Sequence, residues 1–458
     1  MKREKPVEEL DIISNLPDHI IAHIISFLPT EEAIRTSILS SRWKYLWKGI
    51  NSILLEGNES NLNRFANLVE HVLDNCRSTN FLSIKLSCQQ SPDNICLSRI
   101  NAWISTVLSC NVEKLVFYFW NYFPDLPAPP LPTCILDCST LIVLKLDSYF
   151  DLRIPESVVC FPHIKSLGFH VILPNQERVM HQLLSSCPVL EELSLSGLLD
   201  SGNVRKINIS IPTLKKLRLC LEYSKEGEYD VLIDTPNLEY LYIEDDSFSR
   251  FVVKNLSRLH HVEIMYEAVC IESLEPKHIN RLLELLKGVA AADVMTLHFP
   301  TASILGSALR YTWPTFPYLT MLKMNLTDTS GWTCFPRVLH SAPNLKVLIL
   351  DLGRMNWEIE AREPCPWTPP DNVPLCLLEN LQIIGVKWFA GFDDEVQALQ
   401  YLLKDSQVLK RVLIHPCPYE ETVNELLMCP RASGTCDFQF CEEIFFKTSR
   451  IKITVWGI

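Results

Sequence analysis

The chain has 458 residues, 47% of them hydrophobic and 21% charged, proportions typical of a folded globular protein rather than a disordered one. Its formal net charge of −12 argues against a dedicated nucleic-acid binder, because such proteins carry a basic surface. No uninterrupted apolar run of about 18 residues occurs, so no membrane span is expected.

The cysteines predict a reducing compartment. Their number, 17, is odd, they are scattered through apolar contexts, and none forms a CxxC pair. The N-terminal stretch lacks the apolar core of a secretory signal. We therefore interpret the cysteines as reduced structural thiols and expect the protein in the cytoplasm or the nucleus.

The apolar run from residue 16 to residue 50 predicts three short helices. The first is expected to begin with Asp18 as its N-cap and to carry a wide apolar stripe before Pro29 ends it. Thr30 is the expected N-cap of the second helix, and the third is expected to start at Ser40 or Ser41. The apolar residues assigned to these helices are Ile20, Ile21, Ile24, Ile25, Leu28, Ala33, Ile34, Ile38, Trp43, Leu46 and Trp47.

Helices this short cannot enclose a core of their own, because domains below about 40 residues usually need a metal, disulfides or a partner. No metal is expected, since His19 and His23 have the spacing of an HExxH motif but Ile20 replaces its glutamate. The segment therefore either caps the structure that follows or docks its surplus apolar surface onto another protein.

The same segment resembles an F-box, the motif by which substrate adaptors of cullin-type ubiquitin ligases attach to a Skp-family protein. The resemblance runs from "LP" at residues 16–17 through "FLP" at 27–29 to "LSSRWKYLW" at 39–47, an ending typical of plant members. It implies that the apolar surplus is buried in a different chain. The residues expected to contact the Skp-family protein are Leu16, Pro17, Ile20, Ile21, Ile24, Leu28, Pro29, Ala33, Ile34, Trp43, Leu46 and Trp47.

A repeat follows this module. Residues 61–76 have apolar positions at helical spacing and predict an amphipathic helix that covers the open end of the next structure. From residue 81 onward, the pattern apolar-x-x-apolar-x-apolar recurs every 21 to 35 residues, as in leucine-rich repeats, where each repeat supplies one short strand. The copies begin at Phe81, Val112, Leu141, Ile164, Leu190, Leu214, Leu238, Leu259, Val294, Leu319, Leu345, Leu378 and Leu409.

Prolines support this register. Proline lacks an N–H and is tolerated at the start of a strand but not inside it, so prolines in one phase favour the repeat over a plain α/β domain. Those standing two residues before a copy are Pro162, Pro188, Pro212, Pro236, Pro317 and Pro343. We expect an α/β protein, with the three-helix module followed by a curved, irregular solenoid whose strands form one parallel sheet on the concave side.

The two residues flanking the second apolar position of each copy are expected to project from the sheet. Near the middle of the array these positions gather basic and aromatic residues, the types enriched at binding hot spots. The substrate-binding residues predicted on this basis are Lys216, Arg218, Tyr240, Tyr242, His261, Glu263 and His298. An ordinary solvated sheet face is the alternative.

A proline-rich stretch before residue 373 indicates a boundary, and a strand, a helix over 393–404 and another strand follow as an α/β cap. This part resembles the FBD region of plant F-box and leucine-rich-repeat proteins in "VPLCLLENL", "YLLKDSQVLKRVLI" and the strand-like tail "RIKITV". The predicted domains are the F-box at 11–50, the solenoid at 51–373 and the FBD-like region at 374–458.

The sequence has no GxSxG, P-loop, GxGxxG or HExxH motif, so we expect no catalytic centre, cofactor or metal. The resemblance implies a non-catalytic adaptor of a Skp–cullin–F-box ubiquitin ligase. Its partners would be a Skp-family protein, the cullin and RING subunits reached through it, and a target protein on the solenoid, with no nucleic acid or membrane. Two alternatives stay open: a scaffold that presents no substrate, and a co-receptor whose concave face holds a hormone or an inositol phosphate.

Overall fold

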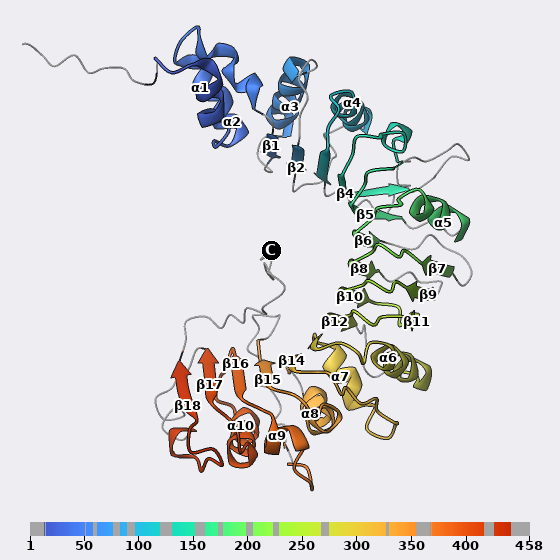
Figure 1. The fold of residues 1–458 in the computed structure, drawn as a ribbon, viewed down its shortest axis with the longest axis vertical. Helices are drawn as coiled ribbons and strands as arrows, with labels where there is room; N and C mark the ends of the chain where they lie inside the picture. The colour runs from blue at the N-terminus through green and yellow to red at the C-terminus, as the bar shows by residue number, and fades with distance from the viewer. Residues whose placement is uncertain are drawn as a thin grey trace, which may run out of the picture. The chain divides into compact units, whose positions relative to one another are not determined.

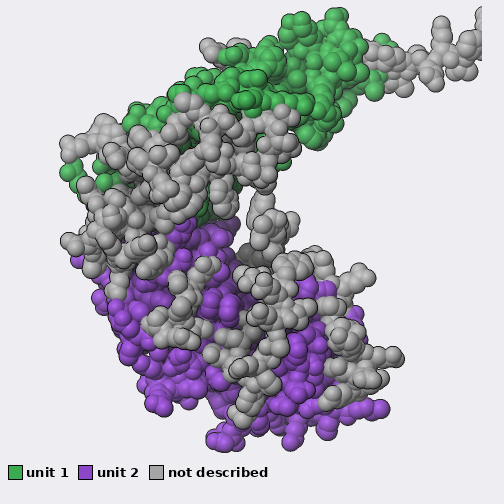
Figure 2. All heavy atoms as spheres, turned by 180° about the vertical axis from the view of Figure 1, so that it is seen from behind, with its two compact units in different colours: residues 1–200 green, residues 201–458 purple. Residues whose placement is uncertain are grey.

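The computed structural model forms two compact units, residues 1–200 and 201–458 (Figure 2). Each unit contains its own run of parallel strands with helices on one side (Figure 1). No described helix is long and apolar enough to cross a membrane. The residues that the structure describes are 13, 15–50, 52–57, 62–76, 83–88, 97–119, 131–151, 161–172, 177–197, 205–222, 229–266, 274–326, 329–353, 367, 369–415 and 426–440.

Unit 1 joins a helical module to a parallel sheet. The module consists of α1 (Asp18–Ile25), α2 (Thr30–Arg35) and two 3-10 helices, η1 (Thr36–Ile38) and η2 (Trp43–Gly49). The strands, each paired with the next in chain order, are β1 (Ser52–Gly57), β2 (Ser83–Cys88), β3 (Lys114–Phe119), β4 (Val143–Asp151), β5 (Ser166–Ile172) and β6 (Glu192–Gly197). The return segments contain α3 (Leu62–Cys76), α4 (Leu97–Leu108), η4 (Thr133–Ile135) and α5 (Glu177–Ser185).

Two helix starts differ from the prediction. α1 follows Pro17, whose carbonyl accepts the N–H of Ile21 at 3.1 Å, and Asp18 makes no capping bond. α2 likewise follows Pro29, and Thr30 is buried with its hydroxyl accepting the N–H of Leu54 in β1 at 2.8 Å. Thr30 therefore connects the helical module to the first strand instead of capping a helix.

This connection gives a stability prediction. Thr30→Val keeps the shape of the side chain but leaves the Leu54 N–H without its acceptor, so we expect the free energy of unfolding to fall by about 1–2 kcal/mol. Amide hydrogen exchange at Leu54 should accelerate together with the loss of stability. Unchanged protection at Leu54 would show that this hydrogen bond does not hold the module to the sheet.

The repeats begin one strand earlier than the prediction places them. In β1, Ile53 aligns with Ile84 and Leu55 with Leu86, so Ile50, Ile53 and Leu55 form a copy of the pattern directly after η2. The amphipathic helix predicted over 61–76 is confirmed as α3, and it lies in the return segment between β1 and β2.

Unit 2 continues the same design. Its main strands are β8 (Lys216–Leu221), β10 (Tyr240–Asp245), β12 (His261–Tyr266), β13 (Val294–Leu297), β14 (Met321–Asn325), β15 (Val347–Asp351), β16 (Ile383–Lys387), β17 (Arg411–His415) and β18 (Asp437–Phe440). Its helices, in the return segments, are α6 (Pro276–Gly288), α7 (Thr301–Gly306), α8 (Thr329–Ser341), α9 (Leu375–Glu379) and α10 (Asp393–Asp405). The predicted strand–helix–strand of the C-terminal part is confirmed as β16, α10 and β17, whereas the strand-like tail at 450–455 lies outside the described residues.

In unit 2 the repeat strands form one parallel sheet, as predicted, but the apolar pattern did not predict the further sheet that accompanies it. A second parallel sheet of three strands occupies return segments where other repeats have helices, in the order β11 (Arg250–Lys254), β9 (Tyr229–Asp234) and β7 (Arg205–Ile209). This sheet forms because the apolar residues of the segment repeat with a period of two. In β9 every second residue is buried, namely Tyr229, Val231 and Ile233, a pattern that fits a strand and not a helix.

Two predicted copies are out of register. β13 aligns Met295 with Val262, so the copy begins at Ala292 and not at Val294. β16 aligns Ile384 with Leu348, so that copy begins at Leu381 and not at Leu378. The other described copies have the predicted phase, and their apolar positions form the buried core between sheet and return segments.

The phased prolines lie in the turns that precede the strands rather than at the strand starts. Three turns are bonded to their neighbours, because an asparagine in one turn donates its side-chain N–H to the proline carbonyl of the preceding turn. The pairs are Asn237 to Pro212 at 2.7 Å, Asn344 to Pro317 at 2.8 Å and Asn380 to Pro343 at 3.1 Å.

None of the nine cysteines whose side chains the structure describes forms a disulfide, and five of them are buried. Burial raises the pKa of Cys187 to about 11 and that of Cys376 to about 12. These two thiols are therefore protonated at neutral pH and act as small apolar side chains.

Candidate functional site

The helical module of unit 1 exposes many large apolar side chains. Phe27, in the turn between α1 and α2, is 76% exposed, and Ile38, at the end of η1, is 86% exposed. Apolar groups concentrated in this way on a folded surface mark an interaction site. We call the following exposed residues the docking surface: Ile20, Ile24, Phe27, Leu28, Ile38, Leu39 and Tyr45.

Four of the residues predicted to contact a Skp-family protein lie instead in the interior of unit 1: Ile21, Ala33, Trp43 and Trp47. The ring of Trp47 is 6.5 Å from the ring of His71 on α3. The apolar surplus of the module is thus divided, because part of it packs against its own chain and part of it stays accessible. These four residues are buried in their own chain, and their contact with a Skp-family protein stays a prediction.

The other eight predicted contact residues are exposed or half-buried, and their role in binding stays a prediction: Leu16, Pro17, Ile20, Ile24, Leu28, Pro29, Ile34 and Leu46. The structure adds Phe27, Leu39 and Tyr45 to the accessible set, and it adds Ile38, which the sequence assigns to a buried side. Helical spacing alone cannot identify them, because the chain around Ile38 is a short 3-10 helix with a different period.

Arg42 holds the two ends of the module together. Its guanidinium pairs with Asp18 at the start of α1, with Nη2 2.7 Å from Oδ1, and also donates to the carbonyl of Leu16. The "LP" and "RW" strings of the sequence therefore meet in space, and the pair fixes the chain entering α1 beside η2.

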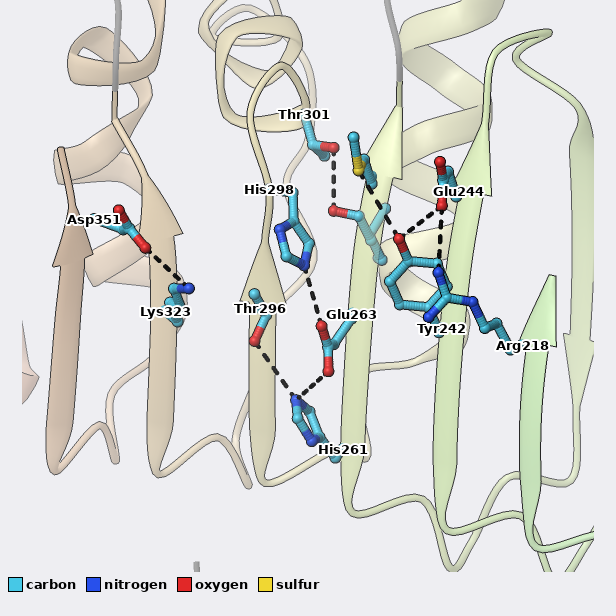
Figure 3. Close-up of polar contacts among 12 residues, drawn as sticks. Arg218, Tyr242, Glu244, His261, Glu263, Thr296, His298, Thr301, Lys323 and Asp351 are labelled. Atoms are coloured by element: carbon cyan, nitrogen blue, oxygen red, sulfur yellow. Dashed lines mark hydrogen bonds and ion pairs between the residues drawn. The ribbon is translucent and has the colours of Figure 1, made fainter. Parts of the chain in front are cut away.

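The second candidate site lies in unit 2, on the face of the sheet opposite the helices, which we call the open face (Figure 3). Glu263 of β12 is its centre. Tyr240 Oη donates to Glu263 Oε1 at 2.9 Å, and His298 Nε2 lies 3.1 Å from Oε2. His261 Nε2 lies 3.5 Å from both Glu263 Oε1 and the hydroxyl of Thr296.

These contacts set the protonation of the cluster. Burial alone would raise the pKa of Glu263, but the hydrogen bond from His298, aided by the charges of His261 and His298 and by the Tyr240 hydroxyl, outweighs it and lowers that pKa. Burial lowers the pKa of His261 and raises that of Tyr240. At neutral pH the cluster is therefore an ionised carboxylate surrounded by its own donors.

Replacing Glu263 tests whether the cluster stabilises the fold. Glu263→Ala removes the acceptor used by Tyr240 and His298, and we expect the free energy of unfolding to fall by about 1–2 kcal/mol, measured by urea denaturation. Glu284→Ala, at an exposed site on α6, is the matched control and should change it by less than about 0.5 kcal/mol. Equal effects of the two variants would show that the cluster has no stabilising role.

A second group on the open face involves Arg218, whose guanidinium lies 4.0 Å from the centroid of the Tyr242 ring and 3.7 Å from Glu244. The Tyr242 hydroxyl also donates to Glu244 at 2.7 Å. Cation–π and ionic contacts thus hold Arg218 over the sheet. Farther along, Lys323 Nζ is 3.0 Å from Asp351.

The structure brings the seven predicted substrate residues together, and most of their polar groups bind one another. Lys216 is exposed and lies opposite Tyr240 in the strand register. Thr296 aligns with Glu263, a position that the sequence assigns to His298. The predicted register of β13 is thus wrong by two residues, and because side chains alternate along a strand, His298 still reaches the open face.

Among the residues with described side chains, no His, Cys, Asp or Glu group could hold a metal ion.

The fold thus defines a leucine-rich-repeat protein with a helical docking module at its start. Family models agree with each part. The model of the F-box domain matches residues 13–54, the model "FBD-associated F-box protein At5g56370, LRR repeats" matches 100–265, and the FBD model matches 369–414. These ranges leave the boundaries predicted at residues 50 and 373 as predictions.

Similar proteins come from Arabidopsis thaliana. The F-box/FBD/LRR-repeat protein At5g22660 is 29% identical over 453 residues, covering 93% of this chain and 96% of that protein. The putative FBD-associated F-box protein At3g50710 is 28% identical and is covered to 99%. The chain therefore carries an F-box, leucine-rich repeats and an FBD region, the combination found in its plant homologues, the F-box/FBD/LRR-repeat proteins.

Proposed function

We propose that this chain is the substrate-recognition adaptor of a Skp–cullin–F-box ubiquitin ligase in the cytoplasm or nucleus. F-box domains bind Skp-family proteins, and leucine-rich repeats bind targets. The observation that carries the proposal is the docking surface, because a helical module that has its own buried tryptophans still exposes residues such as Phe27 and Ile38. A partner that covers them would gain the free energy of apolar burial.

In this function the chain does no chemistry. The F-box would attach it to the Skp-family protein, through which the cullin and the RING subunit bring the charged ubiquitin enzyme. The open face would hold the target, so that a target lysine and the activated thioester reach a high effective concentration. F-box proteins with repeats of this kind are typically adaptors rather than enzymes, and this fits the absence of catalytic motifs from the sequence.

Reconstitution tests the proposal. The full chain, co-expressed with a plant Skp-family protein, should co-elute with it in gel filtration and should then recruit a cullin–RING complex. With ubiquitin-activating and ubiquitin-conjugating enzymes added, a protein bound to the repeats should become ubiquitinated only when the full chain is present. Co-elution without any ubiquitination of the bound protein would favour the scaffold alternative.

The co-receptor alternative has less support from the open face. A hormone carboxylate or an inositol phosphate needs converging basic groups, but Arg218 is engaged by Tyr242 and Glu244, and Lys323 is engaged by Asp351. An anion binding there would have to displace these carboxylates.

A further inference from the structure

The residues on the open face of unit 2 change from polar and aromatic to apolar about halfway along the sheet. The strand register aligns one residue from each strand, in a line that we call the first row: Lys216, Tyr240, His261, Val294, Met321, Val347, Ile383 and Arg411. The residues on β8–β12 are polar or aromatic, and those on β13–β16 are all aliphatic or methionine. We call Val294, Met321, Val347 and Ile383 the apolar strip.

The apolar strip is not part of the core. Its four side chains are all partly exposed, whereas the core positions of the same strands, such as Leu348 and Ile384, are fully buried. The helices α8, α9 and α10 lie on the other side of β14–β17 (Figure 1). An apolar row across four neighbouring strands, on a face that none of the described helices covers, is unusual for a solvated surface.

Cations border the strip at the start of β15 and β17. Lys346 immediately precedes Val347, Lys410 immediately precedes Arg411, and all three cations are exposed. Backbone bonds from Gln382 to Lys346 and from Lys410 to Gln382 place Lys346 and Lys410 two rungs apart, about 10 Å at the usual strand spacing. Within the part of the chain that the structure describes, none of the three cations forms an ion pair.

The acidic groups nearby do not cancel this charge. Asp351 is bound by Lys323, and Asp293 lies 3.3 Å from His260. Asp437 on β18 is exposed and lies opposite Arg411 in the register, and Glu379, at the end of α9, is exposed as well, so Lys346 and Lys410 rather than Arg411 carry the basic character. A chain with a net charge of −12 thus carries a local basic edge beside its apolar strip.

From this arrangement we propose that the apolar strip and its basic edge bind an extended acidic segment of the target protein that also carries aliphatic side chains. The aliphatic groups would lie on Val294, Met321, Val347 and Ile383, and carboxylates two or four residues apart, which share one side of an extended segment, would reach Lys346 and Lys410. This inference rests on the proposed function, since it names the class of target. It also moves the principal contact away from the Glu263 cluster, whose polar groups are used by one another.

A random peptide library displayed on phage is the probe. Panned on the full chain, it should enrich peptides that combine Asp or Glu with Leu, Ile or Val. A fluorescein-labelled enriched peptide should bind the full chain in fluorescence anisotropy, and its affinity should fall as salt rises, because exposed charges are screened. Enrichment of basic or purely apolar peptides, or no enrichment, would overturn the proposal.

Variants locate the site. Lys346→Glu/Lys410→Glu/Arg411→Glu should weaken the peptide at least about tenfold at low salt, and Val347→Asp should weaken it at all salt concentrations. The matched control, Arg250→Glu/Lys254→Glu/Arg258→Glu, changes three exposed cations on and beside β11 and should keep the affinity within about twofold. Equal losses of peptide affinity in the two triple variants would show that the effect depends only on net charge, and would refute the site.

The same variants separate this inference from the proposed function. Binding to a Skp-family protein should be unchanged in both triple variants, because all six substitutions lie in unit 2 and the docking surface lies in unit 1. Loss of peptide binding with intact Skp binding supports the inference. A chain that binds the peptide at the strip but no Skp-family protein would keep the site and remove the adaptor function.

Discussion

Ile20→Asp/Ile24→Asp is expected to weaken binding to a Skp-family protein by at least about 100-fold, a loss of about 2.7 kcal/mol or more. Both side chains lie on α1, 37% and 46% exposed, so the substitutions should leave the fold intact. In a complex, each aspartate would be buried against apolar groups of the partner without a counter-charge, which is far more costly than removing a methyl group. Isothermal titration calorimetry with the purified full chain measures the effect.

The control uses the same kind of change elsewhere. Leu309→Asp/Tyr318→Asp replaces two apolar residues in unit 2 that are 48% and 65% exposed, and it should leave the affinity unchanged. Ile21→Asp would be a poor test, because Ile21 is buried and its loss would unfold the module itself. Wild-type affinity in the Ile20/Ile24 variant would place the partner somewhere other than on α1.

Asp245→Ala is expected to lower the free energy of unfolding of unit 2 by about 2–4 kcal/mol. Asp245 ends β10 and is fully buried, and its carboxylate accepts three bonds: from the Ser247 N–H at 3.1 Å, the Ser249 N–H at 2.6 Å and the Ser249 hydroxyl at 3.0 Å. Alanine would leave these donors without an acceptor in the turn that leads to β11. Urea denaturation followed by tryptophan fluorescence measures the loss, and Asp230→Ala, on the half-buried side of β9, is the control.

The same carboxyl group predicts a pH dependence. Burial, which outweighs the three hydrogen bonds and the charge of Arg281, raises the pKa of Asp245 from 3.8 to about 6. The folded state therefore binds this proton more tightly than the unfolded state, so the group's contribution to stability is greatest below pH 4 and is lost as the pH rises to about 6.

Asp245→Asn isolates that contribution, because asparagine does not titrate and every other ionisable group is shared with the wild type. The stability of the wild type minus that of Asp245→Asn should decrease as the pH rises from about 4 to about 6.5. A difference that stays constant over this range would mean that Asp245 has an ordinary pKa in the folded protein.

Much of the fold can be predicted from the sequence, because the same apolar pattern recurs in the same strand register in most repeats. The phase of most copies, the helix over 62–76 and the strand–helix–strand around α10 all follow from apolar spacing. The two slipped copies show the limit of such spacing. At β13, the first core position is occupied by the small residue Ala292. The larger Val294 begins a second match to the same apolar pattern two residues later, and apolar spacing alone selects that wrong copy. At β16, several overlapping apolar residues satisfy the pattern, and α9 takes up Leu378.

The candidate sites can be predicted only in part, because the apolar pattern does not identify the surface against which a side chain packs. Ile38 is predicted on a buried helix face and Trp43 in contact with another chain, yet Ile38 is exposed and Trp43 is buried in its own chain. Likewise, the sequence groups Tyr240, His261 and Glu263 as available for a partner, and only the geometry shows that they bind one another. The apolar strip becomes visible once the register of β13 and β16 is correct.

The junction between η2 and β1 has a consequence for ubiquitin transfer. η2 ends at Gly49 and β1 begins at Ser52, so two positions separate the docking module from the first strand. A flexible tether would let a docked target sweep a large volume and offer many lysines in turn. With so short a junction and with Thr30 bonded to Leu54, the first repeats instead move with the docked module as one body. Under the proposed function, a target held at these first repeats would then have its lysines selected by their place on its surface more than by their chemical reactivity.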